Sequence, residues 1–393
     1  MLRHLGGTYG SENVEWINVT PVSPGRTSSL RKLRDEFTSE PFRATLLPIW
    51  LIPIAGFLEW RLAPIVMFFY MLLRFGRGRN TLFFVEMVRS AWPFIFYKKI
   101  FSIPLIVDIH GTQDEVVQSA PRNLKTSLQY AEAVFFESRV MSESDGIVAV
   151  STRMLDALKS RYGYLPPHSA VVPSSANSSS FSWAEERRNR VREELGVKDR
   201  FVFVYSGGTD SWQCIDETLS IFDHIRKSDH FKNLDVMLLL LVWNKAFSAE
   251  ERCSRLNIAY NHIVQRALPQ HEVSGYLNAC DAGFLLRRNI TTNLVASPTK
   301  AGEYLLSGLP IICTPFVGDI SQLVQQHDVG YQIDIDGATE MTSLSSWCAR
   351  VRSERNEFAR RAIATGKAHF DESQYRRVSE LIEAVTSHRS AST

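Results

Sequence analysis

DAGFLLRRNITTNLVASPTKAGEYLLSGLPIICTPFVG, residues 281–318, reads in the order strand, polar loop, helix, strand. The apolar run at 282–285 predicts a buried strand, and the glycine and apolar run at 308–313 predict the end of a helix and the next strand. Ser297 is a suitable N-cap and Pro298 a suitable first helical residue. The N-terminus of this helix would face the carboxyl end of a strand, where open α/β sheets bind ligands and where a helix favours phosphate.

Charged residues gather at this predicted site. Lys300 and Glu303 lie three residues apart in the first turns of the helix and so share a face. The cation suits a diphosphate, and the carboxylate suits two ribose hydroxyls. Arg287 is a second candidate for the diphosphate, and Arg288 is an equal alternative because side-chain direction alternates at a strand end. The simpler alternatives are a solvated lysine and a glutamate that only favours the N-terminus of its own helix.

Outward from this stretch, short apolar runs alternate with amphipathic ones. This alternation predicts α/β domains with doubly wound parallel sheets. The expected helical stretches include residues 154–161, 185–195, 216–226 and 271–278. The expected strands are residues 14–19, 81–88, 104–109, 146–150, 169–172, 201–205, 235–241, 263–266, 282–285 and 310–313.

A polar segment at 173–183 without periodicity is typical of a linker. It separates two α/β units of similar size, and the cleft between such units is the default ligand site. We therefore expect domains over residues 1–180 and 181–365, followed by a helical segment over 366–393. Gly6 and Gly7 have no apolar strand ahead of them, so the first strand of the N-terminal domain is expected to be weak or missing.

The composition excludes several classes of protein. The chain has 393 residues, 45% apolar and 22% charged, with a net charge of +2, which gives no basic field for nucleic acid. Five cysteines form no C-x-x-C pair, so neither a disulfide framework nor a structural zinc site is indicated, and a reducing compartment fits. The D-x-D at 334–336 runs into a glycine and is typical of a turn. We expect no metal and no cofactor.

Two apolar segments suggest a membrane partner. Residues 44–58 and 62–73 carry no charge, and Glu59 and Arg61 separate them. Each is shorter than the roughly 18 residues of a bilayer span. Residues 61–100 then hold seven basic residues, including Arg74, Arg77 and Arg79, against one acidic residue. We expect a cytoplasmic protein, peripheral on the anionic inner face of the cytoplasmic membrane; the alternatives are a buried core helix and a true span.

The motifs of the chain resemble those of the retaining glycosyltransferases of family 4, which have the GT-B fold. The resemblance runs over about residues 81–330, and its pieces follow the family's order. The matching pieces are Ser297-Pro298-Thr299-Lys300, Glu303-Tyr304-Leu305, Gly308-Leu309-Pro310, Val317-Gly318-Asp319, Tyr205-Ser206-Gly207-Gly208, LPQHEVSGYLNACDAGFLL at 268–286, SDGIVAVSTRM at 144–154, VVPSSAN at 171–177 and DIHGT at 108–112.

The resemblance implies two Rossmann-like domains, acceptor-binding and nucleotide-sugar-binding, and a last helix that packs back on the N-terminal domain. It implies transfer of a sugar with retention from a nucleotide-sugar. The apolar and basic character of the N-terminal domain suggests a lipid-linked acceptor in cell-surface polysaccharide biosynthesis. His110 would contact the donor sugar, and Asp108 would support it or contact acceptor. Lys300 and Arg287 would stabilise the departing diphosphate. Further substrate contacts are assigned to Glu303, Gly207, Gly208, Asn293, Ser297 and Thr299.

The chain departs from the family at two places. Val295 stands where the family usually has a first glutamate, so Asn293 or backbone N–H groups would have to contact the donor sugar. Gly208 and Gln213 stand in the loop where the family has an arginine and a lysine, which leaves the diphosphate to Arg287 and Lys300. Two alternatives therefore remain open: a sugar-nucleotide epimerase of the same fold, and a non-catalytic scaffold of a polysaccharide assembly complex.

Overall fold

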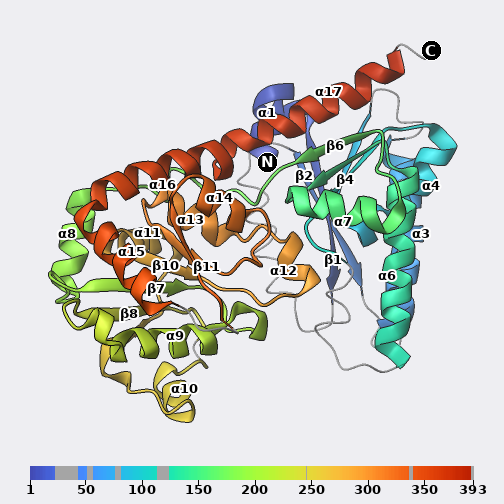
Figure 1. The fold of residues 1–393 in the computed structure, drawn as a ribbon. Coiled ribbons are helices and arrows are strands. Elements are labelled where there is room, and N and C mark those ends of the chain that lie inside the picture. Colours follow the sequence, from blue (N-terminus) through green and yellow to red (C-terminus); the bar gives the residue numbers. More distant parts are fainter. Residues whose placement is uncertain are drawn as a thin grey trace. The chain divides into compact units, whose positions relative to one another are not determined.

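The computed structural model describes residues 1–22, 43–50, 56–75, 81–112, 124–244, 246–335 and 340–390 (Figure 1). The chain divides into two compact units. Unit 1 comprises Met1–Ala149, Leu158–Val172 and Tyr375–Thr393, and unit 2 comprises Val150–Ala157 and Pro173–Gln374. Each unit is an α/β structure built on its own parallel sheet.

Unit 1 has a four-stranded parallel sheet in the order β3-β4-β5-β6. Ile106 and Val148 on one face of this sheet pack with Leu5 of α1 and Leu381 of α17. Phe83 is packed by the rings of Phe75, Phe94 and Tyr97 from α3 and α4. The elements are α1 (Leu2–Tyr9), η1 (Ser11–Asn13), β1 (Glu15–Val22), β2 (Arg43–Trp50), α3 (Gly56–Phe75), β3 (Phe83–Glu86), η2 (Val88–Ala91), α4 (Trp92–Phe101), β4 (Leu105–Ile109), α6 (Leu124–Glu143), β5 (Gly146–Ala149), β6 (His168–Val171) and α17 (Arg376–Ser390). The residues of α7 (Thr152–Tyr162) are divided between the two units at Ala157.

The N-terminal part of unit 1 contains a second, two-stranded sheet. Its strands β1 and β2 pair in parallel, with Glu15 opposite Arg43. The apolar segment predicted at 44–58 is thereby divided: its first part is strand β2, residues 51–55 lie outside the described residues, and the rest begins helix α3. Among the helices that the structure describes, none is long and apolar enough to cross a bilayer.

Unit 2 has a six-stranded parallel sheet in the order β12-β11-β10-β7-β8-β9. The predicted strands are found here with shifts of a single residue at most, and β12 is an addition that the sequence pattern did not reveal. The strands are β7 (Phe201–Ser206), β8 (Val236–Leu241), β9 (Ile263–Arg266), β10 (Ala282–Leu285), β11 (Ile311–Cys313) and β12 (Gly330–Gln332). The helices are α8 (Glu185–Glu194), η3 (Ser211–Gln213), α9 (Ile215–Lys227), η4 (Asp229–Phe231), α10 (Ala249–Arg255), η5 (Tyr260–His262), α11 (Gln270–Ala279), α12 (Thr291–Val295), α13 (Thr299–Leu306), α14 (Ile320–Gln326), α15 (Met341–Ser353), α16 (Arg355–Phe370) and η6 (Glu372–Tyr375).

The four inner strands of unit 2, β7, β8, β10 and β11, are buried on both faces. Phe203 and Leu238 belong to a core with α9 and α15, and Val204 and Leu239 belong to another core with α11 and α13. Burial on both faces explains why these strands read as continuous apolar runs. All five cysteines of the chain lie in unit 2, are buried and form no disulfide.

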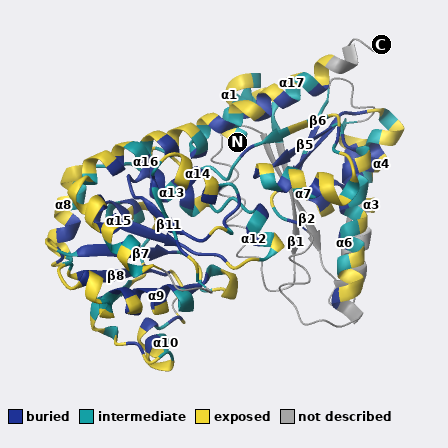
Figure 2. Ribbon diagram, in the orientation of Figure 1, coloured by how far each residue is buried: buried dark blue, intermediate teal, exposed yellow. Residues whose placement is uncertain are grey.

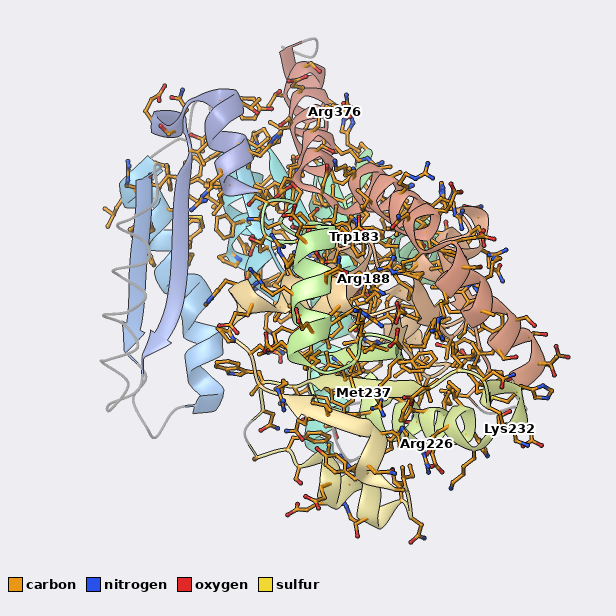
Figure 3. All side chains as sticks on the ribbon, turned by 90° about the vertical axis from the view of Figure 1, so that its left-hand side faces the viewer. Trp183, Arg188, Arg226, Lys232, Met237 and Arg376 are labelled. Atoms are coloured by element: carbon orange, nitrogen blue, oxygen red, sulfur yellow. The ribbon has the colours of Figure 1, made fainter. Side chains whose placement is uncertain are left out.

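Asp281 fixes the start of β10 beside β7. Its carboxylate accepts the backbone N–H of Val202 at 2.8 Å and pairs with Arg188 at 2.5 Å and Arg192 at 3.1 Å. The guanidinium of Arg188 also lies 5.9 Å from the ring of Trp183, which Figure 3 labels beside it. Because the two strands are held together where they begin, the loops that follow them keep a fixed spacing at the other edge.

The predicted linker at 173–183 has no helix or strand but is held in place within unit 2. The backbone N–H of Ala176 donates to the carbonyl of Phe370 at 2.8 Å. The hydroxyl of Ser178 donates to Glu372 at 2.8 Å. These hydrogen bonds hold the segment against α16 and η6 of unit 2.

Candidate functional site

The loop after β7 begins at Gly207, which lies against Lys300 of α13. A β-carbon on Gly207 would collide with Cε and Nζ of that lysine. The backbone N–H of Gly207 donates to the carbonyl of Leu241 at 3.0 Å, which keeps the ends of β7 and β8 together. The absent side chain therefore leaves the space that the Lys300 side chain fills, directly beyond a strand end.

Arg287 follows β10 at the same edge of the sheet. It is 5% exposed, and its Nη1 donates to the carbonyl of Leu286 at 2.8 Å. The hydroxyl of Thr314 accepts its backbone N–H at 3.0 Å and donates to its carbonyl at 2.7 Å, so the backbone is held from both sides. No carboxylate among the described residues forms an ion pair with this guanidinium. Burial lowers the pKa of Arg287.

Lys300 lies close enough to Arg287 for the two charges to repel. Burial lowers the pKa of Lys300, the charge of Arg287 lowers it further, and Glu303 and Asp210 act in the opposite direction. Within the described part of the chain, the ammonium group has no hydrogen bond or ion pair. Arg287 is buried and Lys300 half-buried, and neither forms an ion pair with a carboxylate of the described residues. Two such cations in one site are costly unless an anion binds there. Their arrangement suits a diphosphate.

Glu303 lies one turn further along α13. Burial raises the pKa of this carboxyl, and the charge of Lys300 lowers it. Neither of its oxygens bonds to a side chain that the structure describes. A half-buried carboxylate with free acceptor sites suits paired hydroxyl groups, such as those of a ribose.

Tyr304 holds α13 against the sheet. It is fully buried, and its hydroxyl oxygen accepts the backbone N–H of Ser206 at 2.9 Å and donates to the carbonyl of Phe284 at 3.4 Å. The last residue of β7 and the interior of β10 are thus joined through one side chain. The sequence pattern did not reveal this structural role of Tyr304. Its only hint was an aromatic residue next to Glu303 in the motif.

Arg288, the alternative to Arg287, already has a partner. Its Nε donates to Oε1 of Glu217 at 2.9 Å, and its side chain is exposed. Of the two arginines, Arg287 is therefore the better candidate for the diphosphate, because it is buried and has no carboxylate partner among the described residues.

The remaining predicted residues of unit 2 have varied surroundings. Asn293 is buried, and its side-chain amide donates to the carbonyl of Arg288 at 3.0 Å, so it braces the loop. The prediction that Ser297 is the N-cap was wrong by one position: α13 begins at Thr299 after Pro298, and the Ser297 hydroxyl accepts the N–H of Ser174 at 3.2 Å. Thr299 and Gly208 are exposed, and the carbonyl of Gly208 accepts the hydroxyl of Tyr205.

In unit 1, His110 and Asp108 form a pair at the carboxyl end of β4. Nε2 of His110 lies 3.1 Å from Oδ2 of Asp108. The imidazole is half-exposed and the carboxylate is buried. The hydrogen bond to Asp108 raises the pKa of His110, burial opposes it, and the charges of Asp108 and Glu86 reinforce it. Nδ1 is therefore the ring nitrogen left for a ligand.

Metal-ligating side chains do not gather in the part of the chain that the structure describes. No group of three or more His, Cys, Asp or Glu residues there could hold an ion. Of the D-x-D motif, Asp336 lies outside the described residues.

Solved structures with a similar architecture include a sucrose-phosphate synthase and glycosyltransferases. Sucrose-phosphate synthase from Thermosynechococcus elongatus is 12% identical, with a TM-score of 0.66 over 96% of this chain and 100% of that one. Anabaena HepE, solved in complex with UDP-glucose, is 12% identical, with a TM-score of 0.64 over 95% of this chain and 99% of that one. WaaG, a glycosyltransferase involved in lipopolysaccharide biosynthesis, is 11% identical, with a TM-score of 0.59 over 95% and 100% of the two chains.

The chain has the GT-B fold. That fold consists of two Rossmann-like domains, as the sequence predicted. No family model matches the chain, and no curated protein matches it in sequence.

Proposed function

We propose that this protein is a glycosyltransferase that moves a sugar from a nucleotide-sugar to an acceptor. The observation that carries the proposal is the pair of cations formed by the buried Arg287 and the half-buried Lys300, neither of them in an ion pair among the described residues, with Glu303 one helical turn from Lys300. A nucleoside diphosphate matches this set, because its phosphates need cations and its ribose offers two neighbouring hydroxyls. Anabaena HepE, which has a similar fold, forms a complex with UDP-glucose, and this supports the choice of a nucleotide-sugar donor.

The chemistry proposed is that of a retaining enzyme of family 4. The bond between the anomeric carbon and the diphosphate oxygen breaks with its electron pair going to the diphosphate. The acceptor hydroxyl forms the new bond on the same face of the sugar, and its proton passes to the departing phosphate. Arg287 and Lys300 stabilise the negative charge that develops, which is a larger effect in the transition state than in the bound donor.

Unit 1 supplies His110 to this proposal. Asp108 holds Nε2, so that Nδ1 can donate to or accept from a hydroxyl of the donor sugar. We assign His110 to the sugar rather than the nucleotide on the resemblance of DIHGT to the family's loop. Asp108 acts through His110 and is a positioning residue.

The proposed acceptor is a lipid-linked saccharide of a cell-surface polysaccharide, met at the inner face of the cytoplasmic membrane. The support lies in the apolar segments and basic residues of the N-terminal half of the chain. The proposed reaction needs no metal and no cofactor, since Arg287, Lys300 and the N-terminus of α13 together take the diphosphate charge.

The test combines donor and acceptor panels. Purified protein is incubated with membranes and each of several labelled nucleotide-sugars, and the lipid extract is counted. We expect one donor to label lipid, and the Arg287→Ala, Lys300→Ala double variant to abolish the label. Epimerisation of a donor without acceptor would indicate the epimerase alternative. Binding of nucleoside diphosphates without turnover of any donor would indicate the scaffold.

A further inference from the structure

Helix α3 presents an unusual row of large apolar side chains to solvent. Leu73 is 88% exposed, and Ile65, Phe69 and Leu72 are also exposed. The four follow a spacing of four, three and one residues, which places them on one face of the helix. Met67 and Met71 are buried on the other side. The exposed row therefore lies on a different side of the helix from the residues that pack into the core.

Helix α4 packs against both α3 and α6, and α4 and α6 also carry exposed residues (Figure 2). Phe96 and Ile100 are exposed on α4, and Leu128 and Phe135 on α6. The ring of Trp92 lies 4.9 Å from that of Phe96 and 5.5 Å from that of Phe135, which joins α4 to α6.

Helix α3 is joined to α4 by an aromatic contact as well. The ring of Phe68 lies 5.6 Å from that of Tyr97. Phe69, the exposed neighbour of Phe68, follows directly. We call the exposed side chains of these three helices the apolar face; its members are Ile65, Phe69, Leu72, Leu73, Phe96, Ile100, Leu128 and Phe135.

Four of the basic residues of 61–100 are paired with carboxylates, which lowers the free charge below the value expected from sequence. The side chain of Arg61 is not described. Counting along residues 61–100 gave an excess of six positive charges, but carboxylates from outside that window reach four of the cations. Arg77 and Arg79 lie outside the described residues. The pairs are Arg74 with Glu15 at 2.8 Å, Arg89 with Glu132 at 3.4 Å, Lys98 with Asp145 at 2.7 Å and Lys99 with Glu143 at 2.7 Å.

In three of these pairs the cation is more exposed than its carboxylate. The side chain of Arg74 is 43% exposed against 16% for Glu15. Arg89 and Lys99 are likewise more exposed than their partners. Aromatic rings beside a rim of outward basic heads are typical of side chains at a bilayer interface. Phosphate groups, which the basic heads suit, are present in zwitterionic and anionic phospholipids alike. The four ion pairs leave less free positive charge for anionic lipid than the sequence count gave, so this surface suits phospholipids of either kind.

We propose that the apolar face inserts into the interface of a phospholipid bilayer, and that this binding depends on apolar contact far more than on anionic lipid. The inference rests on the membrane partner proposed above and names the surface that meets it. Its test measures vesicle binding without donor or acceptor, so its failure would leave the nucleotide-sugar proposal untouched, and the reverse holds as well.

The experiment is co-flotation of the full chain with vesicles of phosphatidylcholine alone and with vesicles half of whose lipid is phosphatidylglycerol. We expect affinities for the two that differ by about fivefold or less, the worth of about one unpaired basic side chain near the surface. We also expect 1 M salt to release little protein, since salt screens charge and not apolar contact. Preference for the anionic vesicles by a hundredfold or more would overturn the inference.

The variant Leu73→Glu, Ile100→Glu tests the surface itself. Both positions are exposed, so the fold should tolerate the change, which circular dichroism and thermal midpoint would check. We expect binding to both vesicle types to fall at least tenfold. Tyr164→Glu, an exposed aromatic residue of unit 1 outside the three helices, is the matched control and should bind as the parent does. Undiminished binding by the double variant, or a parent that ignores both vesicles and sediments as a dimer, would overturn the assignment.

Discussion

The ammonium end of Lys300 lies where a β-carbon on Gly207 would have to stand. The glycine after β7 and the lysine of α13 thus occupy one site, although they lie 93 positions apart in the sequence. The relationship explains how the site can hold a cation although the usual arginine and lysine of the loop are absent.

Gly207→Ala should displace Lys300 and lower the affinity for a nucleoside diphosphate by roughly tenfold, the loss of about one charge-assisted contact. Calorimetry with UDP measures it. In the Gly207→Ala, Lys300→Ala double variant we expect no further loss beyond Lys300→Ala, because both changes remove the same contact. Gly7→Ala, at a helical glycine with open space around it, is the control. Additive losses would show that the two residues act separately.

Arg287→Met should separate binding from folding. A buried cation without a carboxylate costs free energy, so the ligand-free variant should melt at or above the temperature of the parent. Inorganic diphosphate at a hundredfold excess over its Kd should stabilise the parent by about 2.7 kcal/mol and the variant much less. Differential scanning calorimetry with and without diphosphate measures both effects. Arg288→Met, which breaks an exposed ion pair, should leave the stabilisation by diphosphate intact. A large fall in the ligand-free midpoint of Arg287→Met would instead indicate a structural role.

Glu303→Ala should weaken binding of UDP by about 1.5–3 kcal/mol, because a carboxylate that accepts hydroxyl hydrogen bonds is removed. Inorganic diphosphate, which has no ribose, should bind the variant as well as it binds the parent. Titration calorimetry with both ligands provides the comparison. Equal affinity for UDP in variant and parent would rule out the ribose assignment.

His110→Ala should lower turnover more than it lowers affinity for the product nucleotide, because His110 is assigned to the sugar. Steady-state rates and UDP titrations of the same preparation give the two numbers. A variant that binds UDP far more weakly yet turns over normally at saturation would contradict this role.

Asp108→Asn should return the pKa of His110 toward its ordinary value. The raised pKa of the parent means that the pairing stabilises the folded protein below about pH 6.5 and that this contribution disappears as the pH rises through the folded-state pKa. Titration of the imidazole by NMR in parent and variant measures the shift directly. An unchanged titration would mean that Asp108 does not hold the ring in solution.

The sheet of unit 2 was predictable because its inner strands are buried on both faces and so appear as uninterrupted apolar runs, as at 201–205 and 236–241. Strand β12 was missed because its three half-buried residues leave no such run. Strand β2 was missed because an apolar run has the same appearance in a strand, a buried helix and a membrane segment.

The position of the candidate site could be predicted from the strand ends and the start of a helix. The burial and the ion pairs of its side chains could not. Nothing in the local pattern distinguishes Arg287 from Arg288; the distinction comes from Glu217, which lies on a different helix. The charge around α3 and α4 was misjudged for the same reason. A window of sequence cannot count carboxylates such as Glu15 and Glu143 that the fold brings in from outside it.

The buried cysteines allow the opening of unit 2 to be measured by their chemical labelling. Burial raises the pKa of each thiol, so a folded chain should resist alkylation, and any thiol that reacts has first been uncovered. Since unit 1 contains no cysteine, the labelling rate follows the opening of unit 2 alone. Mass spectrometry of labelled chains can then time the opening around Cys313, the last residue of β11, separately from that around Cys253 on α10. The measurement needs no engineered probe and can be made with and without a nucleotide.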